Sequence, residues 1–205
     1  MYRLYSIPGS CSTGIHALLN KLGQPVEVVY RDDVSDYQQL VPTNQVPALV
    51  DGGELLTEGA AIVMHLLEKH GAAPLPGEET REFRQWLLFN YATLHATYSK
   101  LFMVAAHSPI DHDESRALLV SDIAARLTVL WRIVETRLEG RPFMVGEAPT
   151  VIDYLLALYA NWGNAFPDAN IEIGPNTRRL IAAVLELPEF AEALARENVD
   201  YRIAA

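Results

Sequence analysis

A single cysteine, Cys11, lies in the segment PGSCSTG, between a Pro-Gly turn and the start of a helical pattern. The first N–H groups of a helix have no partner within it, and the helix dipole adds a partial positive charge there. A thiolate at that point would be stabilised and its pKa lowered, and the flanking Ser10 and Ser12 could donate hydrogen bonds to it. An inert, half-buried cysteine fits the position equally well. Since CSTG is not a C-x-x-C motif, redox chemistry at Cys11 would need a thiol from outside the chain.

The segment QVPALV could bind an extended ligand through its backbone. Pro47 follows the β-branched Val46 at the start of a predicted strand, where proline would remove a ladder hydrogen bond. A cis Val46–Pro47 bond would leave the Val46 backbone free to pair with a ligand strand. An ordinary trans proline at a strand edge is the more common arrangement.

The segment TEGA could bind an α-amino acid group. Thr57 or Glu58 is predicted to cap the following helix, whose N-terminus is a natural carboxylate site. Gly59 would let a ligand approach the backbone closely, and Glu58 could hold an ammonium group beside the carboxylate. A plain N-cap followed by an acid is the commoner reading of such a segment.

Histidines are scattered, and none has the spacing of a metal site. The run HSPIDHDE (107–114) is typical of a helix end, a turn and an acidic helix start, so no metal is expected. His95 lies in the middle of a helical pattern, which favours a structural role when it is considered alone. Tyr98 and Phe102 follow it at i+3 and i+7, and so share its helix face as pocket or core residues.

Composition narrows the class of protein. The chain has 205 residues, a net charge of −10, and hydrophobic residues at half of its positions, which predicts a folded protein without a nucleic-acid groove. One cysteine excludes an intramolecular disulfide and a multi-thiolate zinc site. Neither a signal peptide nor an apolar run of about 18 residues is present, so we expect a cytoplasmic protein.

Hydrophobic periods divide the chain into two parts. The first part predicts strands and helices in the order β-α-β-α-β-β-α: strands at 2–6, 26–30, 45–50 and 54–57, and helices at 15–22, 35–41 and 58–71. A Pro/Gly-rich segment then has no period. The second part predicts helices at 80–106, 111–139 and 150–162, and two short ones, capped by Asn176 and opened by Pro188. Thr150 and Asp153 match a capping box.

Together these segments resemble the cytosolic glutathione transferases. PGSCS, QVPALV, LTEGAAIV and LHATYSKLF are similar to the bacterial beta class, which has a cysteine in its active site. The resemblance covers the whole chain and is strongest in residues 1–70. It implies a thioredoxin-like domain at 1–72 that binds glutathione, a linker at 73–79, and an all-helical domain at 80–205 that lines the second-substrate site. It also implies a homodimer, with glutathione as co-substrate.

Site residues follow from the resemblance position by position. It implies a catalytic group in which Cys11 faces the glutathione sulfur and Tyr5, Ser12 and His95 lie nearby. It implies glutathione-binding residues at Ser10, Gln45, Val46, Pro47, Glu58 and Gly59, with Val46 pairing with the cysteinyl part. Tyr98 and Phe102 are candidates for the second-substrate pocket.

The chain also departs from the family pattern. Gly59 stands where the family usually has serine, so one hydroxyl to the carboxylate is missing. Asn44 replaces the usual glycine before QVP, which is tolerable because asparagine accepts the left-handed conformation. Arg31 is the only suggestion for a contact to the glycine end of glutathione, and Leu88 replaces a polar residue.

The implied activity is conjugation of the glutathione thiol to small hydrophobic electrophiles, a detoxification reaction of a bacterial transferase. Thiol-transferase or peroxidase side activity through Cys11 stays open. A second hypothesis is a regulatory or carrier protein that binds glutathione with little catalysis, because a fold does not determine a function.

Overall fold

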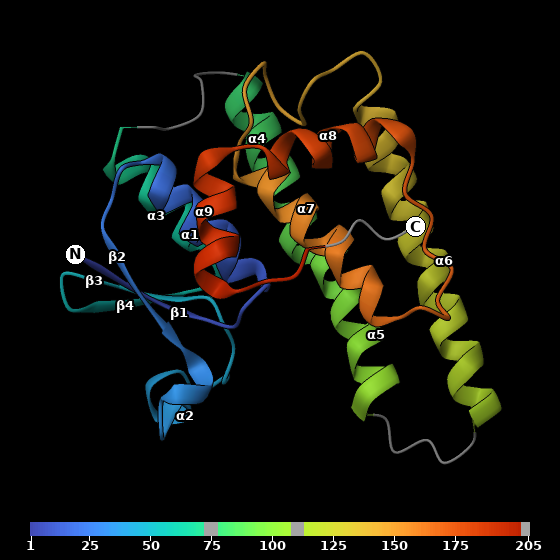
Figure 1. The fold of residues 1–205 in the computed structure, drawn as a ribbon, viewed down its shortest axis with the longest axis horizontal. Helices are drawn as coiled ribbons and strands as arrows, with labels where there is room; N and C mark the ends of the chain where they lie inside the picture. Colours follow the sequence, from blue (N-terminus) through green and yellow to red (C-terminus); the bar gives the residue numbers. More distant parts are fainter. Residues whose placement is uncertain (72–77, 108–112, 202–205) are drawn as a thin grey trace.

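The computed structural model describes residues 1–71, 78–107 and 113–201 (Figure 1). Its first part is a four-stranded sheet with the order β2-β1-β3-β4, in which β1 and β2 are parallel and the other pairs antiparallel. The strands are β1 (Tyr2–Ser6), β2 (Val26–Tyr30), β3 (Ala48–Asp51) and β4 (Glu54–Thr57). The predicted third strand begins at 48 rather than 45, consistent with Pro47 having no N–H for the ladder.

Helices cover both faces of this sheet. On one face α1 (Cys11–Lys21) and α3 (Gly59–Lys69) pack on Leu4 and Leu49. On the other, the short α2 (Tyr37–Leu40) contributes Tyr37 to a small cluster with Tyr5, Val41 and Ala48. A 3-10 turn, η1 (Arg31–Asp33), precedes α2. Because strand side chains alternate, Leu4 and Tyr5 face opposite layers.

The second part is helical. Its elements are α4 (Glu78–Leu88), a π-helical segment η2 (Phe89–His95), α5 (Ala96–His107), α6 (Asp113–Arg137), α7 (Val151–Trp162), a 3-10 turn η3 (Gly163–Ala165), α8 (Pro175–Leu185) and α9 (Pro188–Glu197). The single helix expected over 80–106 is therefore interrupted by a π-helical stretch. The expected linker, 73–79, lies largely outside the described residues, and the division into two domains stays a prediction.

Helix α1 joins the two parts, since it packs against α3, α7 and α9 (Figure 1). Gly14 lets α1 approach α7: a Cβ there would stand 3.2 Å from Leu155 Cδ2. Helix α7 is buried over its first ten residues and forms the centre of the helical part. Its predicted capping box is confirmed, with Thr150 and Asp153 bonding to each other's backbone N–H groups.

The N-terminus of α8 differs from the prediction. Gly174 is the N-cap and Pro175 the first helical residue, so Asn176 is not the cap. The carboxylate of Glu135, from α6, accepts the backbone N–H groups of Asn176 and Thr177 at 2.9 Å. The side chain of Glu135, from another helix, thus satisfies the first N–H groups of α8 that a local cap was expected to satisfy.

Candidate functional site

A cavity of about 180 Å³ lies between the segment before β3, the N-terminus of α3 and the π-helical segment. It brings together seven of the predicted site residues: Cys11, Gln45, Val46, Pro47, Glu58, Gly59 and His95. Four further residues complete its lining: Val41, Thr43, Thr57 and Tyr91. Tyr5, Ser10, Ser12, Tyr98 and Phe102 do not line it.

Cys11 is the first residue of α1, directly after the N-cap Ser10. The thiol is buried, and its Sγ–H donates to the carbonyl oxygen of Val46 at 3.7 Å. Burial raises the pKa of Cys11 to about 12, although the backbone N–H groups of Cys11 and Ser12 act in the opposite direction. The expectation of a lowered pKa is therefore wrong, because desolvation of the anion outweighs the helix N-terminus.

We expect Cys11 in the folded protein to react with iodoacetamide on the order of 10³-fold more slowly than a free thiol at pH 7–8. The thiolate fraction falls tenfold for each unit by which the pKa exceeds that of a free thiol. Because a raised pKa leaves the thiol protonated, the rate should climb with pH through 10 without levelling. Mass spectrometry of timed samples measures this, with urea-unfolded protein as the control. A plateau at pH 7–8 would contradict it.

The segment before β3 has two uncommon backbone conformations, at Asn44 and at the Val46–Pro47 bond. The Val46–Pro47 peptide bond is cis, as the ligand-binding hypothesis required. Asn44 has φ +56°, in the left-handed region that its side chain tolerates. The hydroxyl of Tyr37 donates to the Gln45 carbonyl oxygen at 2.9 Å and so holds this segment against α2.

Glu58 precedes the first residue of α3 with φ +69° and ψ 106°, an uncommon conformation for a residue with a side chain. Its side chain makes no hydrogen bond to the first turn of α3, and no acid occupies that turn. The expected side-chain cap by Glu58 is therefore not formed. Gly59, the first residue of α3, lines the cavity beside Glu58, so a helix N-terminus lies next to an acidic side chain, an arrangement that suits an anion next to a cation. Backbone strain of this kind clusters at ligand sites.

His95 ends the π-helical segment and lies 5.3 Å from Trp162 and 5.8 Å from Tyr159, measured between ring centroids. The hydroxyl of Ser99 lies 3.4 Å from its Nδ1. Burial lowers the pKa of His95, so the imidazole is neutral at pH 7 and able to accept a proton.

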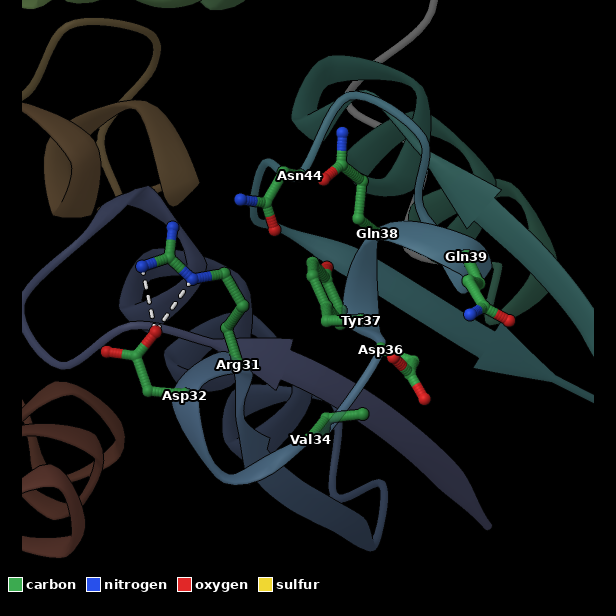
Figure 2. A pocket seen from close by; sticks show the side chains of 8 residues that line it. All are labelled: Arg31, Asp32, Val34, Asp36, Tyr37, Gln38, Gln39 and Asn44. Atoms are coloured by element: carbon green, nitrogen blue, oxygen red, sulfur yellow. Dashed lines mark hydrogen bonds and ion pairs between the residues drawn. The ribbon is translucent and has the colours of Figure 1, made fainter.

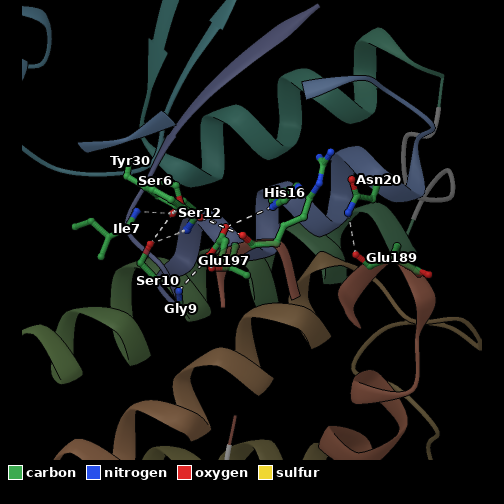
Figure 3. A network of polar contacts seen from close by, with 12 residues as sticks. Ser6, Ile7, Gly9, Ser10, Ser12, His16, Asn20, Tyr30, Glu189 and Glu197 are labelled. Atoms are coloured by element: carbon green, nitrogen blue, oxygen red, sulfur yellow. Dashed lines mark hydrogen bonds and ion pairs between the residues drawn. The ribbon is translucent and has the colours of Figure 1, made fainter. Parts of the chain in front are cut away.

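The hydroxyls of Ser10 and Ser12 take part in a polar network with Ser6 (Figure 3). Their hydroxyls lie 2.5 Å apart, and Ser12 Oγ also lies 2.8 Å from Ser6 Oγ. This corrects the expectation that Ser10 and Ser12 donate to a thiolate, because their hydroxyls are engaged with each other and with Ser6. The serines belong to a buried polar network that extends to Glu197 of α9.

Glu197 is the centre of this network and was not singled out in the sequence (Figure 3). Its buried carboxylate accepts the Gly9 N–H at 3.1 Å and the Thr13 hydroxyl at 2.6 Å. The hydroxyl of Ser6 and Nδ1 of His16 each lie 3.4 Å from its other oxygen. Glu197 therefore braces both sides of the turn that carries Cys11.

Tyr5 lies on the wrong face of the sheet for its expected role. Its ring packs on Tyr37, with centroids 5.4 Å apart, on the α2 side. The hydroxyl interacts with the guanidinium of Arg3. Since β1 alternates its side chains, a residue that shares the face of Arg3 cannot also face α1.

Tyr98 belongs to the core, and the partly buried Phe102 packs against it. Tyr98 is fully buried and its hydroxyl accepts the indole N–H of Trp131 at 3.0 Å. Phe102 packs on Trp162 and Phe166. Of the two readings left open for this aromatic stripe, the core reading fits the structure.

Arg31 lies outside the cavity. It lines a separate open hollow beside α2, together with Asp32, Val34, Asp36, Tyr37, Gln38, Gln39 and Asn44 (Figure 2). Its guanidinium pairs with the Asp32 carboxylate at 2.8 Å. The structure therefore gives no support to Arg31 as a contact of the Cys11 cavity.

Two general findings concern the described residues only. Within residues 1–71, 78–107 and 113–201, no group of three or more His, Cys, Asp or Glu side chains is arranged to hold a metal ion. None of the helices in those ranges combines the length and apolar character needed to cross a bilayer. Most of the run HSPIDHDE, including His112, lies outside them.

The chain matches one family model and is similar in sequence to members of that family. The family model described as glutathione S-transferase, N-terminal domain, matches residues 4–74. Glutathione S-transferase GST-4.5 of Xanthomonas campestris pv. campestris is 30% identical over 170 residues, covering 79% of this chain and 82% of that protein.

Two solved structures extend the likeness to nearly the whole chain. The bacterial beta class glutathione S-transferase of Sphingomonas chungbukensis superposes with a TM-score of 0.79 at 23% identity, over 97% of this chain and 100% of that one. A sphingomonad glutathione S-transferase complexed with glutathione has a TM-score of 0.78 and 25% identity, over the same shares.

Proposed function

The chain belongs to the glutathione S-transferase family, and from that premise we propose that it binds reduced glutathione beside Cys11 and transfers its thiol to a small electrophile. One observation carries the proposal: a single cavity contains Cys11, the Val46 backbone and the N-terminus of α3 with Glu58. A similar sphingomonad transferase was solved with glutathione, which supports the same ligand here.

The proposed binding mode uses the backbone. The cysteinyl part of glutathione pairs with Val46 as an added strand. Its γ-glutamyl carboxylate lies on the N–H groups at the start of α3, and its ammonium group faces Glu58. Gln45 and Pro47 also line the cavity.

The proposed chemistry makes glutathione the nucleophile. Cys11 stays protonated, because burial raises the pKa of its thiol to about 12. Its S–H, which donates to Val46 in the absence of ligand, donates instead to the glutathione sulfur and stabilises the thiolate. The neutral His95 accepts the proton that glutathione loses. The thiolate then forms an S–C bond with the electrophile, and the leaving group departs with its electron pair.

A test uses Cys11→Ser with 1-chloro-2,4-dinitrobenzene as electrophile and calorimetry for glutathione. We expect wild type to bind glutathione and conjugate it, and Cys11→Ser to retain conjugation within about tenfold, since a hydroxyl also donates a hydrogen bond. Exchange with a glutathione mixed disulfide should disappear in the variant.

The outcomes separate the candidate functions. No heat and no shift in melting temperature at millimolar glutathione would overturn the assignment altogether. Binding without conjugation of any electrophile would favour a regulatory or carrier protein. Complete loss of conjugation in Cys11→Ser would show that Cys11 is more than a hydrogen-bond donor. Full disulfide exchange by the same variant would show that Cys11 is not the redox centre.

The remaining properties follow from the family and are proposed with it. We infer a detoxification role in a bacterial cytoplasm, a thioredoxin-like domain at 1–72 joined to a helical domain at 80–205, and a homodimer. Exposed apolar side chains on the outer surfaces of β4, α3 and α4 support the homodimer: Leu55, Met64 and Leu88 are 37%, 41% and 50% exposed.

A further inference from the structure

Tyr91 reaches from the π-helical segment to the first residue of α3. Its hydroxyl oxygen lies 2.5 Å from the point where a Cβ on residue 59 would stand. A side chain at position 59 would therefore collide with the Tyr91 ring, so the glycine and the tyrosine fit only as a pair. Tyr91 lines the cavity that also contains Cys11, Glu58 and His95.

The hydroxyl of Tyr91 has no hydrogen-bond partner among the described residues, although it is buried. The side chain as a whole is only partly buried, since one side of it faces the cavity. Leaving a buried hydroxyl unpaired costs about 1–3 kcal/mol, and such groups are usually satisfied by water or a ligand. Because the Tyr91 side chain also lines the cavity, an acceptor bound there is the candidate partner for this donor.

The surroundings select an anionic acceptor. The first N–H groups of α3 lie beside the hydroxyl, the N-cap Glu58 makes no side-chain bond to that turn, and the turn itself contains no acid. Burial raises the pKa of Tyr91 well above its usual value, so the hydroxyl keeps its proton and can only donate to an anion. A carboxylate can accept the backbone N–H and the phenol O–H together, one at each oxygen.

We propose that Tyr91 is a binding residue whose hydroxyl donates to the α-carboxylate of the γ-glutamyl group, beside the Gly59 N–H. The inference rests on the proposed function, because it concerns how the same ligand is held. The π-helical segment supports the proposal, because two of its residues, Tyr91 and His95, line the cavity. In the same segment the amide of Asn90 donates to the Trp86 carbonyl oxygen at 3.0 Å. π-Helical turns of this kind occur frequently at functional sites.

The first experiment measures binding of two ligands to Tyr91→Phe by calorimetry. One ligand is glutathione, and the other is γ-aminobutyryl-cysteinylglycine, which lacks only the α-carboxylate. We expect the variant to bind glutathione about tenfold more weakly, as for a lost hydrogen bond to a charged group, and to bind the analogue as wild type does.

Tyr159→Phe is the matched control. Tyr159 also has a buried hydroxyl without a partner among the described residues, but it does not line the cavity. This variant should bind both ligands like wild type. If Tyr91→Phe weakens both ligands equally, or neither, the inference is overturned. If wild type binds no glutathione, the proposed function fails and the inference fails with it.

A second experiment moves the hydroxyl. Tyr91→Ala removes the donor and vacates the space at position 59, so Gly59→Ser combined with it places a hydroxyl at the same point. We expect the double variant to regain glutathione affinity to within about threefold of wild type, while Tyr91→Ala alone stays weak. A double variant no better than Tyr91→Ala would count against the inferred position of the donor.

Discussion

Replacing Glu197 with alanine is expected to lower the free energy of unfolding by about 3–5 kcal/mol. The change removes a buried carboxylate and leaves the buried polar groups bonded to it without a partner. Both Glu197 and His16 have side chains with no exposed surface. Without the carboxylate, the Gly9 N–H and the Thr13 hydroxyl lose their acceptor in the interior. Urea unfolding followed by circular dichroism measures the change.

Glu192→Ala provides the comparison, since Glu192 lies on the exposed side of the same helix. It should change the free energy of unfolding by less than about 0.5 kcal/mol. A loss below about 1 kcal/mol in Glu197→Ala would show that water replaces the carboxylate. The Glu197 variant should also weaken glutathione binding, because the turn bearing Cys11 loses its brace.

The second large effect is expected for Asp153→Ala, with a loss of about 3 kcal/mol in the free energy of unfolding. The buried carboxylate accepts the Met144 N–H at 3.0 Å and the Thr150 N–H at 2.7 Å, and so holds the loop before α7 onto the helix. Each buried donor left without its charged acceptor costs about 1–3 kcal/mol.

Thr150→Ala separates two functions of this capping box: capping the first turn of α7, and holding the preceding loop through the bond between Met144 and Asp153. It removes the hydroxyl that accepts the Ile152 N–H and donates to the Asp153 carboxylate, but keeps the bonds of Asp153 to the Met144 and Thr150 N–H groups, so it should cost about 1 kcal/mol, a usual value for an N-cap. Thermal melting of the two variants measures the difference. Equal losses would mean that Asp153 acts only as a cap and that its bond to Met144 contributes little.

The order of strands and helices could be predicted from the sequence because local periods determine it. Val26–Tyr30 and the capping box at Thr150 are confirmed where they were expected. The π-helical segment could not be predicted, because its apolar residues repeat like those of an ordinary helix. Asn176 looked like a cap, but Glu135 fills that role from a residue far away in the chain.

The residues predicted from segments that act through their backbone lie together in the cavity, and their binding of glutathione stays a prediction. Val46, Pro47 and Gly59 line it because their place depends on the course of the chain. Predictions that depended on side-chain direction failed at Tyr5 and Ser12, and the raised pKa of Cys11 follows from the burial of its thiol in the folded chain.

Tyr91 shows a different limit of sequence reasoning. An aromatic residue in a helical pattern indicates core, and nothing in its neighbourhood marks it as a ligand donor. Gly59 carried the only signal, because a missing side chain in a binding segment leaves space that another residue can fill. The partner that fills this space became visible only when the two segments were seen together.

The position of Glu197 also bears on how the protein is made. During synthesis the turn around Cys11 leaves the ribosome early, whereas α9 follows some 185 residues later, since Glu197 and Ser12 are 185 positions apart. Until then the donors of Gly9 and Thr13 have only water to bind. In a nascent chain the turn around Cys11 therefore reaches its final hydrogen bonding only after α9, the last helix among the described residues, has been made.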